Sequence, residues 1–202
     1  MTRTRNPAAD LPAKAAPTAS PDALARAAAE ARKARGPAPV HLWNPPYCGE
    51  IDIRIAADGT WLHEGSPIGR PAMVRLFSSV LKREGARIYL VTPVEKLGIV
   101  VDDAPFVAVD FRREGDALTF LTHVGDETRA GPDNPIRVAR GEDGAPRPYV
   151  HVRDGLEALI DRKTFYRLVE EGETRTVDGR AWFGVASGGA FFPIQPADEL
   201  EA

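Results

Sequence analysis

The chain is poor in cysteine: its 202 residues include a single one, Cys48, so no disulfide can form within it. It also lacks an apolar run near the ~18 residues that a membrane-spanning helix needs. Its N-terminus carries charge but no apolar core of a signal peptide. These absences exclude a disulfide framework and a spanning helix, and they lead us to expect a cytoplasmic protein.

The sequence also lacks the patterns that announce metal or nucleophilic chemistry. The four histidines do not have the spacing of metal ligands: His41, His63, His123 and His151. Cys48 has no histidine close to it along the chain, so we expect a buried, unreactive cysteine rather than a nucleophile. We therefore predict no catalytic residue, no metal and no cofactor.

Charge is distributed unevenly along the chain. Residues 1–39 hold seven basic and three acidic side chains, which gives +4 and leaves −7 for the remainder of a chain with net charge −3. An acidic body argues against a dedicated nucleic-acid-binding protein, which needs a basic face for phosphate contacts. Residues 1–19 are rich in Ala and Pro and lack periodicity, so we expect a disordered basic tail.

The most informative pattern present is an internal repeat. Residues 68–77 align without a gap over residues 160–169, and both read I-x-R-x-x-x-x-R-L followed by an apolar residue. The offset, 160 − 68 = 92, also places Leu90-Val91 over Trp182-Phe183. Two copies of one small unit predict two similar domains with a cleft between them.

Local patterns predict the elements of the first unit. Ser20 and Pro21 are typical of a helix start, and the helix should run from Asp22 to Arg35. Residues 50–55 alternate between isoleucine and polar side chains, as a half-buried strand does, and Asp58-Gly59 favours a hairpin turn. A helix is expected from about Pro71 to about Arg83, followed by a strand over 87–92 and by a meander of strands over 97–101, 106–111 and 117–122.

The second unit should contain a strand over 149–152, a helix that includes 164–170, and a closing hairpin around Ser187-Gly188-Gly189. The expected fold class is α+β, with two similar units from an internal duplication and antiparallel sheets each packed on one helix. The expected division is a disordered basic tail at 1–19, an N-terminal helix and linker at 20–39, a first domain at 40–124, a loop-rich linker at 125–147, a second domain at 148–196 and a C-terminal tail at 197–202.

The loop before the helix expected at Pro71 is the best candidate for a ligand site. Free N–H groups at a helix start attract anions, Gly65 and Gly69 allow a close backbone approach, and Arg70 is suited to phosphate or carboxylate. Arg162 repeats the position of Arg70, whereas Asp161 is expected to cap its own helix. The alternative is that both arginines pair with carboxylates such as Asp52 or Glu95. The full set of candidate ligand-binding residues is Arg54, Trp61, Gly65, Ser66, Gly69, Arg70 and Arg162.

Several segments together resemble a bacterial family called domain of unknown function 1285. They are WNPPYCGEIDIRI, DGTWLHEGSPIGR, LVTPVEK, PYVHVRDGLEALIDR and WFGVASGGAFF, and the resemblance covers about residues 22–195. It implies a duplicated α+β core whose second domain is loosely like the pleckstrin homology fold. It also implies a site at the domain interface for a nucleotide-like molecule and a signalling role. It carries over no catalytic residue.

Three functions are open as hypotheses. The first is a non-enzymatic ligand-binding or regulatory protein, with a small anionic ligand held between the two repeats and a protein partner as a further option. The second is an enzyme of unknown reaction, although no nucleophile and base are paired in the sequence. The third is a protein-interaction module that uses sheet edges or the second domain, a choice that the fold alone does not decide.

Overall fold

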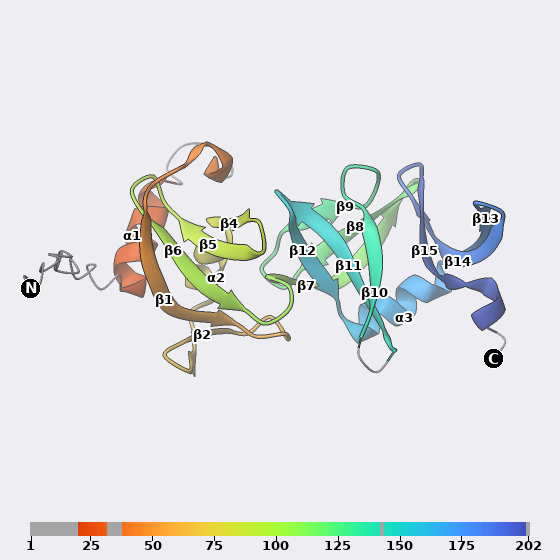
Figure 1. The fold of residues 1–202 in the computed structure, drawn as a ribbon, viewed down its shortest axis with the longest axis horizontal. Helices are drawn as coiled ribbons and strands as arrows, with labels where there is room; N and C mark the ends of the chain where they lie inside the picture. The colour runs from red at the N-terminus through yellow and green to blue at the C-terminus, as the bar shows by residue number, and fades with distance from the viewer. Residues whose placement is uncertain (1–19, 32–37, 142–143, 201–202) are drawn as a thin grey trace, which may run out of the picture.

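The structure is a computed structural model that describes residues 20–31, 38–141 and 144–200. The expected disordered tail at 1–19 and the end of the first helix therefore lie outside the described residues. The described elements form an elongated molecule, with an N-terminal domain, a central sheet and a C-terminal sheet following one another along its long axis (Figure 1). None of the described helices has the length and apolar content needed to cross a bilayer.

The N-terminal domain is built on a six-stranded sheet, sheet A, with strand order β3-β2-β1-β6-β5-β4. Its strands are β1 (Tyr47–Ile55), β2 (Trp61–His63), β3 (Ser66–Pro67), β4 (Leu81–Glu84), β5 (Arg87–Val91) and β6 (Lys96–Val101). The 3-10 turn η1 (Val40–Leu42) precedes the sheet, and the helices are α1 (Pro21–Ala31) and α2 (Pro71–Ser78). The first and last strands, β1 and β6, pair in parallel at the centre of the sheet, so sheet A is mixed rather than antiparallel as expected.

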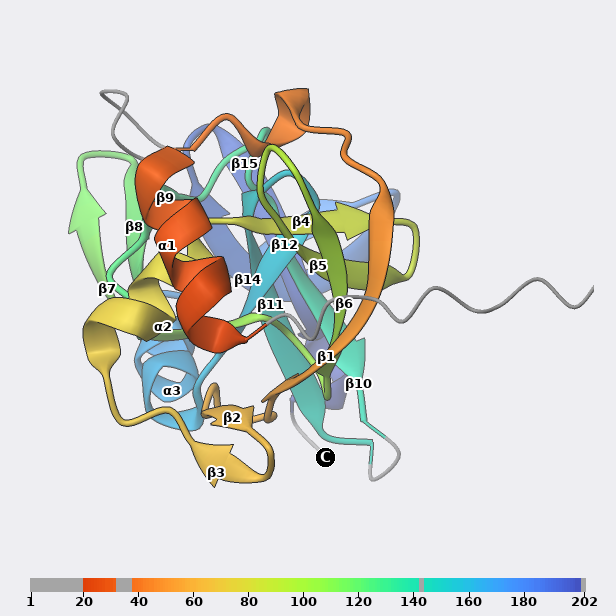
Figure 2. The same cartoon turned by 90° about the vertical axis from the view of Figure 1, so that its left-hand side faces the viewer.

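The expected alternation of β1 is confirmed. Ile51, Ile53 and Ile55 are buried, while Asp52 and Arg54 are exposed. The buried face packs against α2, where the ring of Phe77 lies 6.2 Å from that of Trp61. On the outer side α1 packs against α2 (Figure 2). Ser20 accepts a hydrogen bond from the N–H of Ala23, as expected of a helix-capping serine.

The helix predicted over 71–83 ends at Ser78, and residues 81–84 form β4 instead. Two hydroxyl groups explain the early end. Ser78 Oγ donates to the carbonyl of Arg75 at 2.9 Å, and Ser79 Oγ donates to that of Leu76 at 2.7 Å. Such side-chain bonds compete with the helical ladder, and Gly85, with φ +60°, then turns β4 into an antiparallel hairpin with β5.

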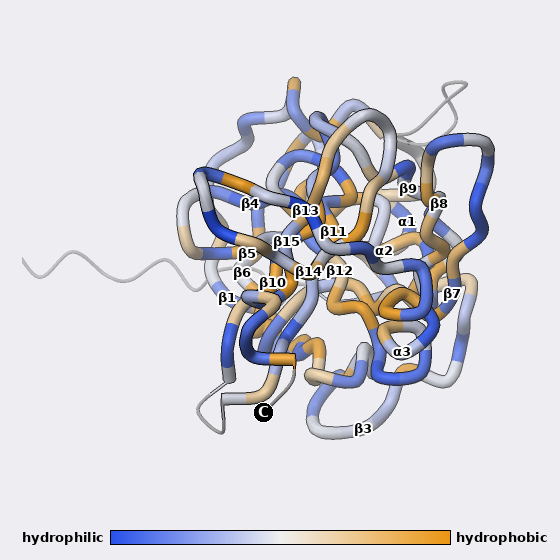
Figure 3. The backbone as a smooth tube through the Cα atoms, turned by 90° about the vertical axis from the view of Figure 1, so that its right-hand side faces the viewer, coloured by the Kyte–Doolittle hydropathy of each residue, from blue (hydrophilic) through white to orange (hydrophobic). Residues whose placement is uncertain are grey.

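The second domain contains sheet B, with strand order β10-β11-β12-β7-β8-β9, and the three-stranded sheet C, with order β13-β14-β15. The strands of sheet B are β7 (Phe106–Glu114), β8 (Ala117–Thr122), β9 (Glu127–Arg129), β10 (Ile136–Arg140), β11 (Pro146–Arg153) and β12 (Leu156–Ile160). The remaining elements are α3 (Arg162–Glu170), β13 (Glu173–Val177), β14 (Arg180–Ser187), β15 (Ala190–Pro196) and the 3-10 turn η2 (Ala197–Glu199). Apolar segments lie toward the interior of these layers and hydrophilic turns lie outside (Figure 3).

This arrangement places the domain division earlier than expected. The expected first domain at 40–124 includes β7 and β8, but these strands hydrogen-bond within sheet B. The expected linker at 125–147 contains β9 and β10, which are the two edges of that sheet. Strands β6, β7 and β8 are consecutive along the chain, yet β6 belongs to sheet A, so they do not form one meander. The chain crosses between the domains at residues 102–105, which link β6 to β7.

Other local expectations for the second domain are confirmed. The carboxylate of Asp161 caps α3 by accepting from the N–H of Thr164 at 2.7 Å. Gly188 and Gly189, at φ +57° and +78°, turn β14 into β15. Ser187 joins sheet C to sheet B, because its Oγ accepts from the N–H of Leu118 and donates to the carbonyl of Ala130, both at 2.8 Å.

Candidate functional site

The loop that contains Gly65, Ser66 and Gly69 lies against the start of α1. Its Ser66 and Gly69 line a hollow of about 330 Å³ together with Pro21 and Asp22. Arg70 forms an ion pair with Asp22 at 3.2 Å, and the two side chains are 70% and 73% exposed. The alternative that Arg70 pairs with a carboxylate of the protein is therefore observed, but the partner is Asp22 rather than Asp52 or Glu95. An exposed pair of this kind contributes at most about 1 kcal/mol.

The remaining candidates are dispersed. Arg54 pairs with Asp102 at 2.8 Å on the surface of β1. Trp61 is buried in the core of the N-terminal domain. Arg162 donates to the hydroxyl of Tyr166 at 2.8 Å, one turn along α3. Within the described residues, Arg54, Arg70 and Arg162 share no pocket and no contact, so the structure does not bring these predicted arginines to one site.

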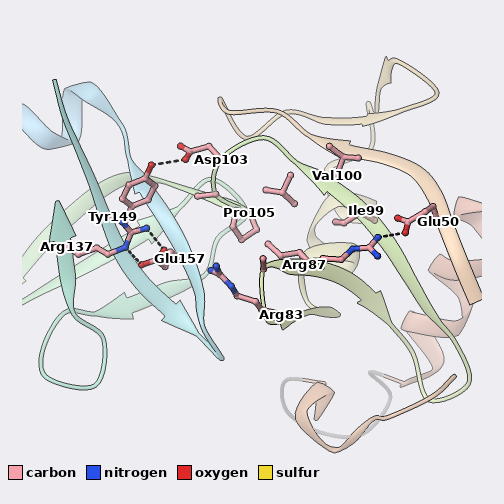
Figure 4. A pocket seen from close by; sticks show the side chains of 14 residues that line it. Glu50, Arg83, Arg87, Ile99, Val100, Asp103, Pro105, Arg137, Tyr149 and Glu157 are labelled. Atoms are coloured by element: carbon pink, nitrogen blue, oxygen red, sulfur yellow. Dashed lines mark hydrogen bonds and ion pairs between the residues drawn. The ribbon is translucent and has the colours of Figure 1, made fainter. Parts of the chain in front are cut away.

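A different set of arginines meets at the seam between the domains. A cleft of about 420 Å³ opens between β4, β5 and β6 on one side and β10, β11 and β12 on the other (Figure 4). We call it the interdomain cleft. It is lined by Glu50, Arg83, Ala86, Arg87, Ile88, Ile99, Val100, Val101, Asp103, Ala104, Pro105, Arg137, Tyr149 and Glu157.

On the N-terminal side, Arg87 is held by Glu50, with which it forms an ion pair. The hydroxyl of Tyr47 also donates to Glu50. The hydrogen bond from Tyr47 is the main cause that lowers the pKa of Glu50, and the interactions with Arg87 lower it further. Together they outweigh burial, which raises this pKa. Glu50 reaches this place because Gly98 has no side chain: a Cβ there would clash with the Glu50 carboxylate.

On the other side, Arg137 makes two parallel hydrogen bonds of 2.6 Å to Glu157 and stacks over the ring of Tyr149 at 4.1 Å. The Tyr149 hydroxyl donates to Asp103 at 2.7 Å, and Arg147 pairs with the same carboxylate at 2.7 Å. Burial, followed by the bond to Asp103, raises the pKa of Tyr149. These bonds fix the position of the guanidinium of Arg137 along one wall.

Arg83 is the exception among the arginines of the cleft. Its guanidinium donates to two main-chain carbonyls at 3.1 Å, Gly85 in its own domain and Gly155 in the other. Among the described residues it has no carboxylate within ion-pair distance. Arg83 therefore brings to the cleft a positive charge that no carboxylate of the described residues neutralises.

The described residues hold no group of three or more His, Cys, Asp or Glu side chains arranged to bind a metal ion. Cys48 is half-buried, and its thiol donates to the carbonyl of Pro46 at 3.4 Å.

Arg83, Arg87 and Arg137 were missed in the sequence because each is an exposed arginine on a strand, a position where an arginine is usually solvated. For Arg87 the signal is the pairing of β1 with β6, which brings its partner Glu50 across Gly98. That pairing joins segments about fifty residues apart, and a local pattern does not encode it.

Comparison with known proteins agrees with the two-domain division. The model of the N-terminal domain of the DUF1285 domain of unknown function matches residues 38–104, and that of the C-terminal domain matches residues 105–194. The boundary between the two coincides with the passage from sheet A to sheet B. A search of curated proteins finds no match.

Two solved structures are similar. One is a DUF1285 family protein from Silicibacter pomeroyi DSS-3, which is 62% identical over 91% of this chain and 98% of its own, with a TM-score of 0.81. The other, a DUF1285 family protein from Shewanella baltica OS155, is 27% identical over 59% of this chain and 91% of its own, with a TM-score of 0.49. With both domain models matched in order and a 62% identical relative, the chain belongs to the DUF1285 family.

Proposed function

We propose that this protein is a non-enzymatic, ligand-binding regulatory protein that holds a small anionic ligand in the interdomain cleft. The observation that carries the proposal is the set of partners of the Arg83 guanidinium, which reaches from β4 to the second domain. Among the described residues it donates to main-chain carbonyls and to no carboxylate. A cation held by neutral acceptors keeps its capacity for a strong, charge-assisted bond to an incoming anion.

The lining of the cleft narrows the class of ligand. Arg83, Arg87 and Arg137 face the acidic side chains of Glu50, Asp103 and Glu157, so the formal charges of the lining cancel. A highly charged polyanion would be repelled by three carboxylates. A ligand with one phosphate or carboxylate for Arg83 and an apolar or aromatic body for Ile99, Val100 and Pro105 fits better, as a mononucleotide does.

A regulatory role is supported by the position of the cleft. Arg83 binds the carbonyl of Gly155, and Arg153 binds that of Ser78 at 2.8 Å, so both arginines join the two domains. A ligand that replaces the bond between Arg83 and Gly155 changes the contacts that hold the domains together. It would therefore favour one domain arrangement over another, which is the basis of a signalling role.

The test is a thermal-shift screen with adenosine monophosphate, pyrophosphate and citrate on the wild type and on Arg83→Met. Arg180→Met is the matched control, because Arg180 is a half-exposed arginine paired with Asp198 outside the cleft. We expect the mononucleotide to raise the unfolding midpoint of the wild type and the control, and Arg83→Met to weaken binding about tenfold or more. Equal binding by Arg83→Met, or no stabilisation by any of the three probes, would overturn the proposal.

We also propose that the two domains arose by duplication of one unit. Support comes from the sheets: sheets A and B have the same strand order, with β1–β6 matching β7–β12 and a parallel central pair in each. This match differs from the register of the sequence repeat, which places α2 over α3, because α2 lies between β3 and β4 whereas α3 follows β12. The likeness of the second domain to the pleckstrin homology fold is likewise a proposal, supported by a six-stranded sheet whose last strand leads into a helix packed on β7. Superposing β1–β6 on β7–β12 tests the duplication, and strands that do not overlay would refute it.

A further inference from the structure

A second, smaller pocket lies elsewhere along the domain seam. Its volume is about 230 Å³, and we call it the hairpin pocket because the β1–β2 hairpin forms one wall. Helix α2 and the turn after β8 form the others. It is lined by Gly59, Thr60, Trp61, Pro67, Ile68, Pro71, Val74, Arg75, His123 and Val124. It shares no residue with the interdomain cleft, so a ligand bound here would be independent of the proposed function.

Two hydrogen-bonding nitrogens of this lining are buried without a partner. The side chain of Trp61 is 2% exposed, and its indole Nε1 has no acceptor among the described residues. The Nε2 atom of His123 is also buried; the main chain of Gly59 lies beside it, but within the described part of the chain no acceptor has the geometry of a full hydrogen bond. A buried donor without an acceptor costs about 1–3 kcal/mol, so two beside one pocket call for an explanation.

The protonation state of His123 is set by its other nitrogen. The main-chain N–H of Val107 donates to His123 Nδ1 at 3.1 Å, so Nδ1 is an acceptor and the proton of the neutral ring is on Nε2. Burial lowers the pKa of His123, which favours this neutral form near pH 7. Both unpartnered nitrogens are therefore donors.

Close packing holds the imidazole in place. A Cβ added at Gly59 would lie 3.0 Å from Val107 Cγ2 and 3.2 Å from His123 Nε2, and Gly59 has φ +85°, a conformation that favours glycine. The hairpin of one domain thus fits tightly over the histidine of the other. The donor of His123 is fixed by packing rather than free to find another partner.

Arg75 adds a positive charge to the same lining. It is exposed on α2, and among the described residues its guanidinium has no ion pair or hydrogen bond. The remaining walls are largely apolar, with Pro67, Ile68, Val74 and Val124 among them. The pocket therefore combines two neutral donors, one cation and a short apolar wall.

We propose that the hairpin pocket binds the carboxylate of a small monocarboxylic acid with a short apolar chain. Trp61 Nε1–H and His123 Nε2–H donate to the two carboxylate oxygens, Arg75 neutralises the charge, and the apolar chain contacts Ile68 and Val74. Phosphate suits the site less, because its additional oxygens would need further donors that this lining does not supply. A volume of 230 Å³ fits a ligand smaller than a drug-sized molecule.

The test uses butyrate as the probe and the indole N–H signals of the three tryptophans in a proton–nitrogen NMR spectrum. Trp61→Phe assigns the signal of Trp61. We expect butyrate to move that signal saturably, at constant pH and ionic strength, and to leave those of Trp43 and Trp182 in place. Inorganic phosphate at the same concentration should move it less.

Arg75→Met is the main variant, because Arg75 is exposed and its loss leaves the core intact. We expect about tenfold weaker butyrate binding, whereas Arg129→Met, an exposed arginine on β9 paired with Asp116, should bind as the wild type does. A Trp61 signal that butyrate does not move, or equal affinity in Arg75→Met, would overturn the proposal. A larger response to phosphate would refute the choice of ligand.

Discussion

Sheets A and B have the same strand order but bury their faces differently. In each, three antiparallel strands are followed by three more, and the first and last strands pair in parallel at the centre. Sheet A carries a helix, α2, between its two halves, whereas the corresponding link in sheet B, between β9 and β10, has none. In the second domain the helix, α3, comes after the last strand and leads into sheet C.

The difference shows how one sheet topology can be completed in two ways. Sheet A closes its core with α2, whose Phe77 is fully buried beside Trp61. Sheet B is covered by α3 and by sheet C, which contacts β8 and β10. The two sheets meet where the short link at residues 102–105 joins them, and the interdomain cleft opens beside that link.

The largest loss of stability should come from truncating the buried phenylalanines of α2 and α3. Phe77 in α2 is fully buried, whereas Phe165 in α3 is 9% exposed. We expect Phe77→Ala to lower the free energy of unfolding by about 3–5 kcal/mol and Phe165→Ala to lower it less. Urea unfolding followed by circular dichroism measures both. A greater loss in Phe165→Ala would mean that α3 contributes more to its core than α2 does.

The second-largest loss of stability should come from removing the hydrogen bonds of Ser187, which join sheets B and C. Ser187→Ala removes the acceptor of the buried Leu118 N–H and the donor to the carbonyl of Ala130. We expect a loss of about 1–3 kcal/mol in the free energy of unfolding. Hydrogen exchange should show faster exchange at Leu118 in the variant. An unchanged exchange rate there would show that Ser187 does not tie the two sheets.

The residues at the starts of α2 and α3 should differ by a smaller amount in their contribution to stability. Asp161 caps α3 with its side chain, while Arg70, at the same place on α2, does not cap. Asp161→Ala should cost about 1 kcal/mol. Arg70→Ser should gain up to a similar amount, because it supplies a cap and gives up an exposed ion pair. If both variants lower the unfolding midpoint equally, the two helix starts do not differ as described.

The smallest effect should be a pH dependence that originates at the seam. Because burial lowers the pKa of His123 in the folded state, the unfolded chain binds a proton first as the pH falls. Stability is therefore lost as the pH falls from about 6.5 toward the lower folded pKa. The carboxylates of Asp58 and Asp126 act in the opposite direction on this pKa.

His123→Gln should remove that contribution. The comparison is the difference in urea midpoint between about pH 7.5 and about pH 5.5, measured in the wild type and the variant. We expect the wild type to lose more stability than the variant over this interval. Equal losses would show that His123 does not contribute to the pH dependence.

Local features of the fold could be predicted from the sequence where one residue type decides them. The alternating isoleucines of β1, the capping residue Asp161 and the glycines after Ser187 all formed the expected elements. Each depends on neighbours a few residues away. The end of α2 could not be predicted this way, because two serine hydroxyls there outweigh an apolar pattern that continues past them.

Long-range pairing was beyond local patterns. Strands β6, β7 and β8 succeed one another through short turns, so nothing in the sequence marks the domain division between β6 and β7. The positions of the arginines in the fold were beyond local patterns for the same reason. Arg70 lies against α1 rather than the other domain, while Arg83 and Arg137 meet only because sheets A and B face each other.

The most direct test of the proposed function observes Arg83 itself. Its side-chain Nε–H signal, assigned through Arg83→Met, is monitored by NMR while adenosine monophosphate is added. We predict a saturable shift whose midpoint matches the concentration that raises the thermal midpoint, because the phosphate replaces the carbonyl partners of the guanidinium. An Arg83 signal that stays in place while the nucleotide stabilises the protein would contradict the account.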